Sequence, residues 1–141
     1  MTIRLESIVN APIDKVKSHF AKDLFTYLLP PGAKLLRFDG SQTGDIVHLK
    51  LPGAGEWMSE IVSHGEGEGE WFFVDKGKIL PMGLQSWRHE HRLQDRGDDT
   101  VIVDHMQFST GKKWLDSLIY PFLYLSFYPR KFQYNRYFSQ V

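Results

Sequence analysis

The sequence predicts an α+β fold in which an antiparallel sheet of about seven strands curls around a long C-terminal helix, with two short helices after the first strand. Three observations lead to this prediction. Apolar and polar residues alternate with a period of two through most of the chain, and turn residues separate the alternating segments at short intervals. Helical spacing of apolar residues then returns from Gly111 to the end. Short separators favour antiparallel neighbours, because a parallel crossover needs about a dozen residues or more.

The chain opens with a strand over residues 3–9, in which buried-type side chains alternate with exposed-type ones. Pro12 and Asp14 then mark a helix start, since proline is tolerated and an acidic residue is favoured in the first turn. The spacing of apolar residues predicts one helix from about 13 to 20 and a second from about 22 to 29. A Pro-Pro-Gly sequence ends the pair, because neither proline can continue a helix.

Six further strands follow, covering residues 34–38, 45–51, 56–63, 70–76, 85–94 and 100–109. Their separators are rich in glycine, aspartate and proline, which are typical of tight turns. The glycine–glutamate repeat between the third and fourth of them is interpreted as a solvated turn. An antiparallel sheet of this kind has one face to bury, and the C-terminal helix is the only predicted element long enough to cover it.

The predicted C-terminal helix carries two rows of large apolar side chains at intervals of four. The first row is Leu115, Ile119, Leu123 and Phe127, and the second is Trp114, Leu118 and Phe122. Together they form a wide apolar face, which we expect to lie against the sheet. Pro121 and Pro129 predict kinks or a break into separate helices, because each removes a backbone donor and crowds the preceding turn. A kinked helix leaves gaps against the sheet, and the sequence leaves open whether side chains fill them.

Composition limits the classes of function. The 141 residues suit one domain spanning 1–141, and 14% of them are aromatic, enough to line a large core or a cavity. Basic and acidic residues balance at seventeen each, so the basic charge typical of nucleic-acid binders is missing. The absence of cysteine excludes disulfides, cysteine-based zinc sites and thiol catalysis. No apolar segment reaches the roughly 20 residues of a membrane span. We therefore expect a cytoplasmic protein with neither nucleic-acid partners nor integral membrane association.

The predicted strand 85–94 is the most informative segment, because it contains two histidines. Side chains alternate along a strand, so Trp87, His89 and His91 share one face and the charged residues between them share the other. Tryptophan and leucine at the two ends of the histidine row mark it as the inner face. Two histidines are therefore predicted to point toward the interior.

The next strand aligns with the histidine strand through the hairpin turn that joins them. With this turn centred between residues 97 and 98, the facing pairs are Trp87–Phe108, His89–Met106, His91–Asp104 and Leu93–Ile102. A one-residue slip would turn the alternate row inward and leave Asp104 outside. The favoured register gives an apolar inner row with a single carboxylate, directly across from His91.

An aspartate opposite an inward histidine has four interpretations, and the residues alone leave them open. The pair is a satisfied buried polar contact, the polar end of an apolar ligand pocket, or an aspartate-oriented histidine for proton transfer. The fourth interpretation is a metal site formed by His89, His91 and Asp104. No pattern of supporting partners for such ligands is visible, so no metal is predicted. Nucleophile elbows, phosphate loops and dinucleotide fingerprints are absent, so no cofactor is predicted.

The order of elements resembles the helix-grip superfamily, also called START-like or SRPBCC. The more specific segments are Phe73–Asp75, Trp87–His91, and Val103–Asp104 followed by Phe108, which are similar to the bacterial ligand-binding SRPBCC proteins. Residues 10–16 resemble the first strand-to-helix junction of the superfamily, and the resemblance covers essentially the whole chain. A glycine–proline pair often precedes the tryptophan in the narrower group, whereas residues 79–83 of this chain read Ile-Leu-Pro-Met-Gly. The loop at the pocket entrance therefore departs from the pattern.

The resemblance implies a cavity between the sheet and the C-terminal helix that binds a hydrophobic small molecule or lipid-like ligand. The residues expected to contact this ligand are Trp87, His89, His91, Asp104, Met106, Phe108, Trp114, Leu118 and Phe122. The alternative function is a polyketide cyclase- or dehydratase-like enzyme in which His89, His91 and Asp104 transfer protons. A third hypothesis is membrane or protein association through the C-terminal aromatic segment, against which the neutral overall charge counts. The sequence identifies neither the ligand nor the oligomeric state.

Overall fold

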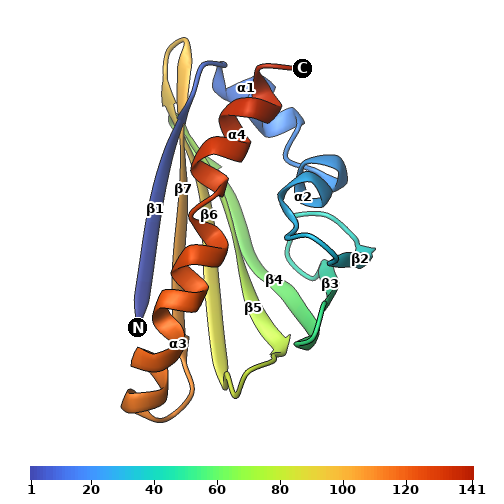
Figure 1. Cartoon of the computed structure of the whole chain (residues 1–141). Coiled ribbons are helices and arrows are strands. Elements are labelled where there is room, and N and C mark those ends of the chain that lie inside the picture. The colour runs from blue at the N-terminus through green and yellow to red at the C-terminus, as the bar shows by residue number, and fades with distance from the viewer.

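The computed structural model describes residues 1–141 and shows a curved antiparallel sheet of seven strands packed against two consecutive C-terminal helices (Figure 1). This is the helix-grip architecture that the sequence predicts. In chain order the elements are β1 (Thr2–Val9), α1 (Ile13–Ser18), α2 (Lys22–Leu28), β2 (Lys34–Phe38), β3 (Ile46–Leu51), β4 (Gly55–Gly67), β5 (Glu70–Ile79), β6 (Ser86–Arg96), β7 (Asp99–Ser109), α3 (Lys113–Phe127) and α4 (Arg130–Phe138).

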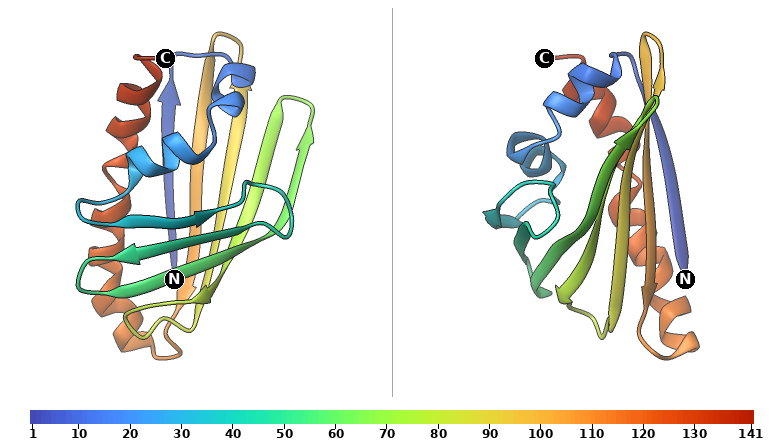
Figure 2. Two further views of the ribbon diagram at one scale, coloured as in Figure 1. Left: turned by 90° about the vertical axis from the view of Figure 1, so that its right-hand side faces the viewer. Right: turned by 180° about the vertical axis from the view of Figure 1, so that it is seen from behind.

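The sheet has the strand order β1-β7-β6-β5-β4-β3-β2, and every neighbouring pair is antiparallel. Strands β2 to β7 form a meander, and β1 joins the far edge beside β7, so α1 and α2 carry the chain from one edge to the other. Figure 2 shows β2 and β3 running across the long strands. This curvature turns the inner face of the sheet into a trough, in front of which α3 and α4 lie.

The predicted register of the histidine hairpin is confirmed. His91 lies opposite Asp104, and the neighbouring pairs follow without a slip along the whole of β6 and β7. Gly97 closes the turn with φ of +83°, a conformation that glycine adopts without steric cost. Leu93 and Ile102, which face each other near the turn, are fully buried. The hydrophobic pattern thus fixes which face of each strand points inward.

The hairpin between β4 and β5 is longer than predicted. The glycine–glutamate repeat was expected to form the turn, but β4 extends to Gly67, which pairs with Glu70. Only residues 68 and 69 lie in the turn, and Gly69 has a φ of +70°. Glycine weakens a strand but does not stop it, and two residues are enough to join antiparallel strands.

Two apolar clusters pack between the trough and the helices. One lies under α1, α2 and α4 and includes Val16, Leu24 and Tyr134; the other lies under α3 and includes Trp87 and Leu123. On β6, Trp87 belongs to the second cluster and Leu93 to the first. The two histidines between them therefore lie at the boundary of the two clusters.

The C-terminal segment is interrupted at Pro129 and not at Pro121. Helix α3 runs through Pro121, and α4 begins directly after Pro129, so that the two helices follow each other end to end (Figure 1). Pro121 and Ser117 are both exposed, so the Ser117 carbonyl that Pro121 leaves without a helical donor can bond to water. None of the four helices combines the length and the hydropathy that a membrane span requires.

The prediction that both apolar rows of this segment face the sheet is wrong for the second row. Leu123 in the first row is buried, whereas Trp114, Leu118 and Phe122 are 65%, 66% and 59% exposed. Each residue of the second row directly precedes one of the first, and successive residues lie about 100° apart around a helix. Packing the first row onto the sheet therefore turns the second row toward solvent.

Two leucines of α3 test this arrangement. We expect Leu123→Ala to lower the free energy of unfolding by about 2–5 kcal/mol, because it leaves a cavity in the core. Leu118→Ala removes an exposed side chain of the same type and should change it by no more than about 0.5 kcal/mol. Urea denaturation of both variants measures the difference, and similar losses for the two would contradict this orientation of α3.

Candidate functional site

Six polar side chains meet at the boundary between the two apolar clusters. They come from three adjacent strands and one helix: Asp75 on β5, His89 and His91 on β6, Asp104 on β7, and Arg130 and Tyr134 on α4. The two-residue period of the strands turns the four strand residues toward the inner face, where each is at most 9% exposed. Helix α4 crosses in front of them and supplies the arginine and the tyrosine. We call these six residues the polar cluster.

Asp104 accepts more hydrogen bonds than any other member of the polar cluster. Its Oδ1 lies 2.8 Å from Nε2 of His89 and accepts a bond of 3.1 Å from Nη1 of Arg130, while its Oδ2 accepts a bond of 3.1 Å from the Tyr134 hydroxyl. Burial on its own would raise the pKa of Asp104, but the charge of Arg130 and the bond from His89 outweigh it and hold that pKa well below its usual range. Asp104 is therefore an ionised carboxylate in the interior, paired with a guanidinium.

His89 is held neutral by the same surroundings. Burial, and next the neighbouring His91, lower the pKa of His89 to about 4, although Asp104 acts in the opposite direction. Since ionised Asp104 can only accept a hydrogen bond, the proton of neutral His89 lies on Nε2. Nδ1 of His89 consequently carries the free lone pair and is the basic atom of the ring.

His91 pairs with Asp75 and not with Asp104. Nε2 of His91 lies 2.8 Å from Oδ2 of Asp75, whereas its Nδ1 lies 3.7 Å from Oδ1 of Asp104 and has no hydrogen-bond partner. Burial on its own would raise the pKa of Asp75, but the bond from His91 and the other polar neighbours together lower it. The His91 ring is stacked between Phe73, with centroids 4.2 Å apart, and His89, with centroids 3.7 Å apart.

The contact expected between His91 and Asp104 is thus replaced by two diagonal ones. Asp75 lies opposite His89, and Asp104 opposite His91, but each carboxylate bonds to the other histidine. Directly opposite Cβ atoms are about 4.5–5.5 Å apart, too close for an imidazole to point its far nitrogen at a carboxylate. Diagonal neighbours are about 7–8 Å apart, which accommodates the ring and the bond.

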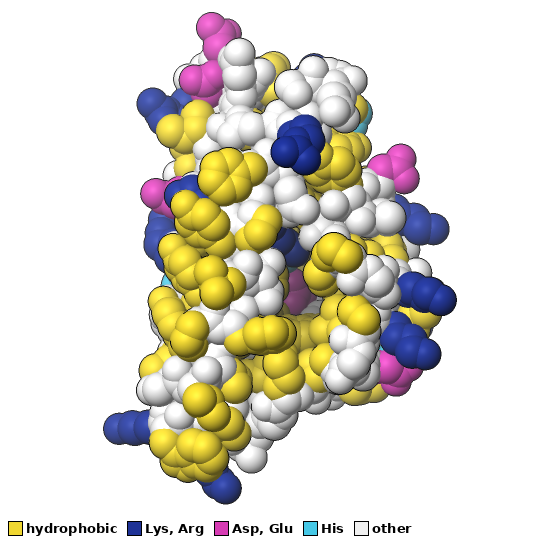
Figure 3. Space-filling model, viewed as in Figure 1, with side chains coloured by type: hydrophobic (Ala, Val, Ile, Leu, Met, Phe, Trp, Pro, Cys, Tyr) yellow, Lys and Arg dark blue, Asp and Glu magenta, His cyan; other side chains and the backbone are white.

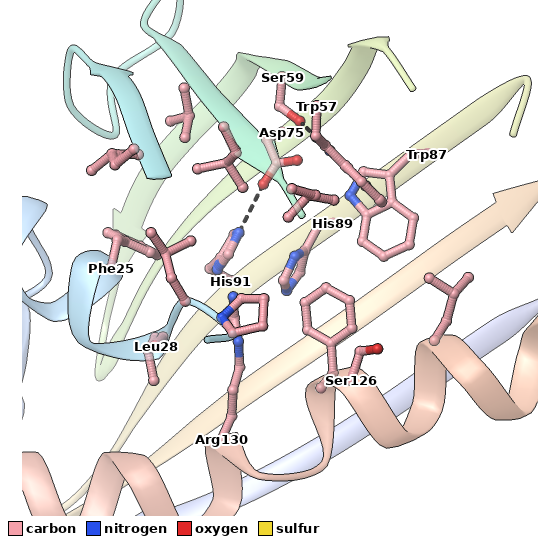
Figure 4. A pocket seen from close by; sticks show the side chains of 18 of the residues that line it. Phe25, Leu28, Trp57, Ser59, Asp75, Trp87, His89, His91, Ser126 and Arg130 are labelled. Carbon is pink, nitrogen blue, oxygen red and sulfur yellow. Dashed lines mark hydrogen bonds and ion pairs between the residues drawn. The ribbon is translucent and has the colours of Figure 1, made fainter. Parts of the chain in front are cut away.

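A pocket of about 280 Å³ opens beside the polar cluster (Figure 3). Its walls are mainly apolar and come from α2, from β2 to β6 and from the C-terminal helices. The polar side chains in its lining are Ser59, Asp75, His89, His91, Ser126 and Arg130. Figure 4 shows Asp75 and the two histidines on one side and Arg130 reaching in from the helix. Asp75 is the only acidic residue of the lining.

The nine residues predicted to contact a ligand fall into three groups. Trp87, His89, His91 and Phe122 line the pocket. Asp104, Met106 and Phe108 are buried but lie outside its lining, so Asp104 reaches the pocket only through His89 and Arg130. Trp114 and Leu118 also lie outside the lining and are exposed, because the row to which they belong turns away from the sheet.

Three members of the polar cluster were not found by sequence reasoning. Asp75 lies on a predicted strand two residues after Phe73, so alternation alone would have placed it on the inner face. Arg130 and Tyr134 follow Pro129, where the sequence leaves a kink or a break open, so their orientation relative to the preceding helix could not be predicted. Nothing in the sequence around Arg130 indicates that this arginine is buried.

The group of residues able to hold a metal ion is Asp75, His89 and His91, whose ligand atoms lie within 4.8 Å of one another. The carboxylate is therefore Asp75, not the Asp104 of the sequence hypothesis. In the structure, Nε2 of each histidine is hydrogen-bonded to a carboxylate and the two rings are stacked. These bonds hold the residues in a hydrogen-bonded network.

Comparison with solved structures shows the fold. A protein designated Ms6760 from Mycobacterium smegmatis superposes with a TM-score of 0.69 at 14% identity, over 99% of this chain and 91% of that one. The Zhui aromatase/cyclase from a Streptomyces species gives a TM-score of 0.68 at 15% identity, over 94% and 90%. Norcoclaurine synthase from Thalictrum flavum, in complex with dopamine and hydroxybenzaldehyde, gives 0.66 at 16% identity, over 86% and 76%. No protein-family model and no curated protein sequence matches the chain.

The neutral state of His89 predicts a loss of stability in mild acid. The unfolded chain protonates this histidine near pH 6.5, whereas the folded protein does so only near pH 4. The unfolded state binds more protons between these values, so the free energy of unfolding should fall by up to about 3 kcal/mol as the pH drops from 6.5 to 4. Denaturant titrations across this range measure the fall.

His89→Gln removes the titrating group and should flatten this pH dependence. His105→Gln is the matched control, because His105 lies on β7 of the same hairpin outside the polar cluster, and it should retain the slope of the parent protein. An unchanged slope in His89→Gln would show that His89 is not the group responsible.

Proposed function

We propose that the protein binds a small hydrophobic molecule carrying a hydrogen-bonding group, in the pocket between the sheet and the C-terminal helices. The observation that carries this proposal is the distribution of apolar and polar residues in the pocket lining. Seventeen of its 26 residues are hydrophobic, and the polar ones converge from β4, β5, β6 and the C-terminal helices. Apolar walls with a few convergent polar groups are typical of small-molecule sites.

Asp75 and Arg130 favour a ligand with a polar group. The Asp75 side chain keeps 12% of its surface exposed and the Arg130 side chain 15%, and both residues line the pocket. A hydroxyl or amine of the ligand would donate a hydrogen bond to Asp75, while a carbonyl would accept one from Arg130. The apolar remainder would lie against side chains such as Leu49, Trp57 and Phe122.

The fold neighbours support a small-molecule ligand. One of them holds dopamine and hydroxybenzaldehyde, and another is an aromatase/cyclase. A volume of about 280 Å³ suits a ligand of the size of one or two rings better than a long lipid chain. A cytoplasmic location and the lack of a nucleic-acid partner stay predictions from composition.

A proton-transfer enzyme is the second candidate, and the state of His89 favours it. His89 lines the pocket, stays neutral at pH 7, and is oriented by the bond between its Nε2 and Asp104. An oriented neutral imidazole has the free lone pair that a general base requires, and the low pKa of His89 makes it a weaker base than an ordinary histidine. In this candidate His89 accepts a proton from the bound molecule, and Asp104 stabilises the imidazolium that forms. His91, oriented by Asp75, faces the same pocket and is the second group for proton transfer.

Two serines of α3 test the binding proposal. Ser126 lines the pocket and bonds only to the carbonyl of Phe122, whereas Ser117 is exposed on the same helix outside the lining. We expect Ser126→Phe to fill part of the pocket and weaken binding of the neutral fluorescent probe N-phenylnaphthylamine by about tenfold or more, equivalent to about 1.4 kcal/mol. Ser117→Phe should leave probe binding unchanged.

Equal probe binding by both variants, or none by the parent protein, would contradict the proposal. Mass spectrometry of molecules co-purifying with the protein separates the two candidate functions. A bound molecule recovered unaltered after incubation supports a binding protein. Conversion of that molecule by the parent protein but not by His89→Gln supports the enzyme.

A further inference from the structure

The outer face of the C-terminal helices exposes a continuous row of large apolar side chains. It consists of Trp114, Leu118, Phe122 and Leu125 on α3 and Phe132 on α4, which are between 59% and 67% exposed. Their spacing of three, four or seven residues places them on one side of the helical segment. Figure 3 shows apolar side chains following the C-terminal helices along this face. We call these five residues the apolar ridge.

The apolar ridge differs from the rest of the surface in both exposure and continuity. The other large apolar side chains that are exposed outside the C-terminal helices include Met1, Ile8, Leu36 and Ile79, each at most 50% exposed. Ile8, Leu36 and Ile79 lie on three different strands. Single exposed apolar residues are normal, whereas a contiguous exposed patch marks a site of interaction. The ridge therefore needs a partner that shields it from water.

The charged residues of the same segment are nearly all basic. From Lys112 to the end of the chain the basic residues are Lys112, Lys113, Arg130, Lys131 and Arg136, and the only acidic side chain is Asp116. Asp116 is 7% exposed and accepts hydrogen bonds from the backbone and the hydroxyl of Thr110. The well-exposed charged side chains of this helical segment itself are thus all positive, even though the chain as a whole is neutral.

The ridge also borders the pocket. Phe122 belongs to both, and Ser126 and Arg130, which follow it along the helices, line the pocket as well. Figure 4 shows Ser126 and Arg130 at the helix side of the pocket, and Figure 3 shows the hollow on the same face as the exposed apolar side chains. A partner that covers the ridge would therefore lie at the mouth of the pocket.

We propose that the apolar ridge docks the protein on the surface of an anionic lipid membrane, with α3 and α4 parallel to the bilayer and the pocket mouth toward the lipids. An amphipathic helical segment with aromatic side chains on one face and basic residues beside them is suited to the interface between headgroups and acyl chains. Each nearby Lys or Arg adds attraction to anionic lipids. Apolar ligands dissolved in the bilayer would then meet the pocket without crossing water.

A second copy of the chain fits the ridge less well. In a two-fold dimer the same surface meets itself, so the basic flanks of the two copies would face each other. No exposed acidic residue of this segment is present to offset that repulsion. The neutral overall charge, which counted against a membrane role at the level of composition, conceals this local basic surface.

Sedimentation with vesicles tests the proposal on the full chain. We expect the parent protein to bind vesicles of phosphatidylcholine mixed with phosphatidylglycerol, and to bind pure phosphatidylcholine vesicles more weakly. Leu118→Ser/Leu125→Ser removes two ridge residues outside the pocket lining and should weaken binding about tenfold or more. Ile8→Ser/Leu36→Ser removes two exposed apolar residues elsewhere and should leave binding unchanged.

Two further measurements complete the test. Lys113→Gln/Lys131→Gln should weaken binding to the anionic vesicles and have little effect on pure phosphatidylcholine. Uptake of N-phenylnaphthylamine and the melting temperature should stay the same in all variants, which separates loss of docking from loss of the pocket or of folding. The proposal is overturned if the parent protein does not bind anionic vesicles, or if both double serine variants bind these vesicles equally. It is also overturned if light scattering shows a dimer that Leu118→Ser/Leu125→Ser dissociates, which would assign the ridge to a second copy.

Discussion

The buried charge of Asp104 is the constraint on which the arrangement of this protein depends. An isolated carboxylate in the interior is unfavourable by many kcal/mol, so it has to be paired and hydrogen-bonded. Its partners come from two directions, His89 from the sheet and Arg130 and Tyr134 from α4. Satisfying the carboxylate therefore fixes where α4 lies on the sheet. A purely apolar contact at this position would tolerate sliding, whereas the two directed bonds from α4 define one alignment.

The position of α4 in turn determines the shape of the pocket. Helix α3 joins α4 at Pro129, so the position of α4 also constrains α3. In this arrangement α3 presents Leu123 to the sheet, while Phe122 and Ser126 border the pocket. The polar cluster occupies the boundary between two apolar clusters, so the pocket has apolar walls and a polar side. The same orientation that makes the pocket turns the apolar ridge outward. The proposed binding and the proposed docking thus both depend on one helix placement.

Sequence reasoning succeeded where a short period and a local turn decide the outcome. The register of β6 and β7 follows from alternation and a glycine turn, and it correctly places His89, His91 and Asp104 on the inner face. It failed where partners are distant in the chain. Which histidine bonds to which carboxylate depends on the reach of an imidazole across the strands, and Arg130 has no periodic signal. The row of Trp114, Leu118 and Phe122 was misplaced because apolar character does not require burial, since much of any folded surface is apolar.

A double-mutant cycle between Asp104 and Arg130 tests the central claim most directly. If the buried pair aligns α4 on the sheet, Asp104→Asn should lower the free energy of unfolding by about 3–5 kcal/mol, because it leaves the guanidinium without its carboxylate. Arg130→Met should then lower the free energy of unfolding far less in the Asp104→Asn background than in the parent protein. Additive effects of the two substitutions, or a loss below about 0.5 kcal/mol for Asp104→Asn, would contradict the account.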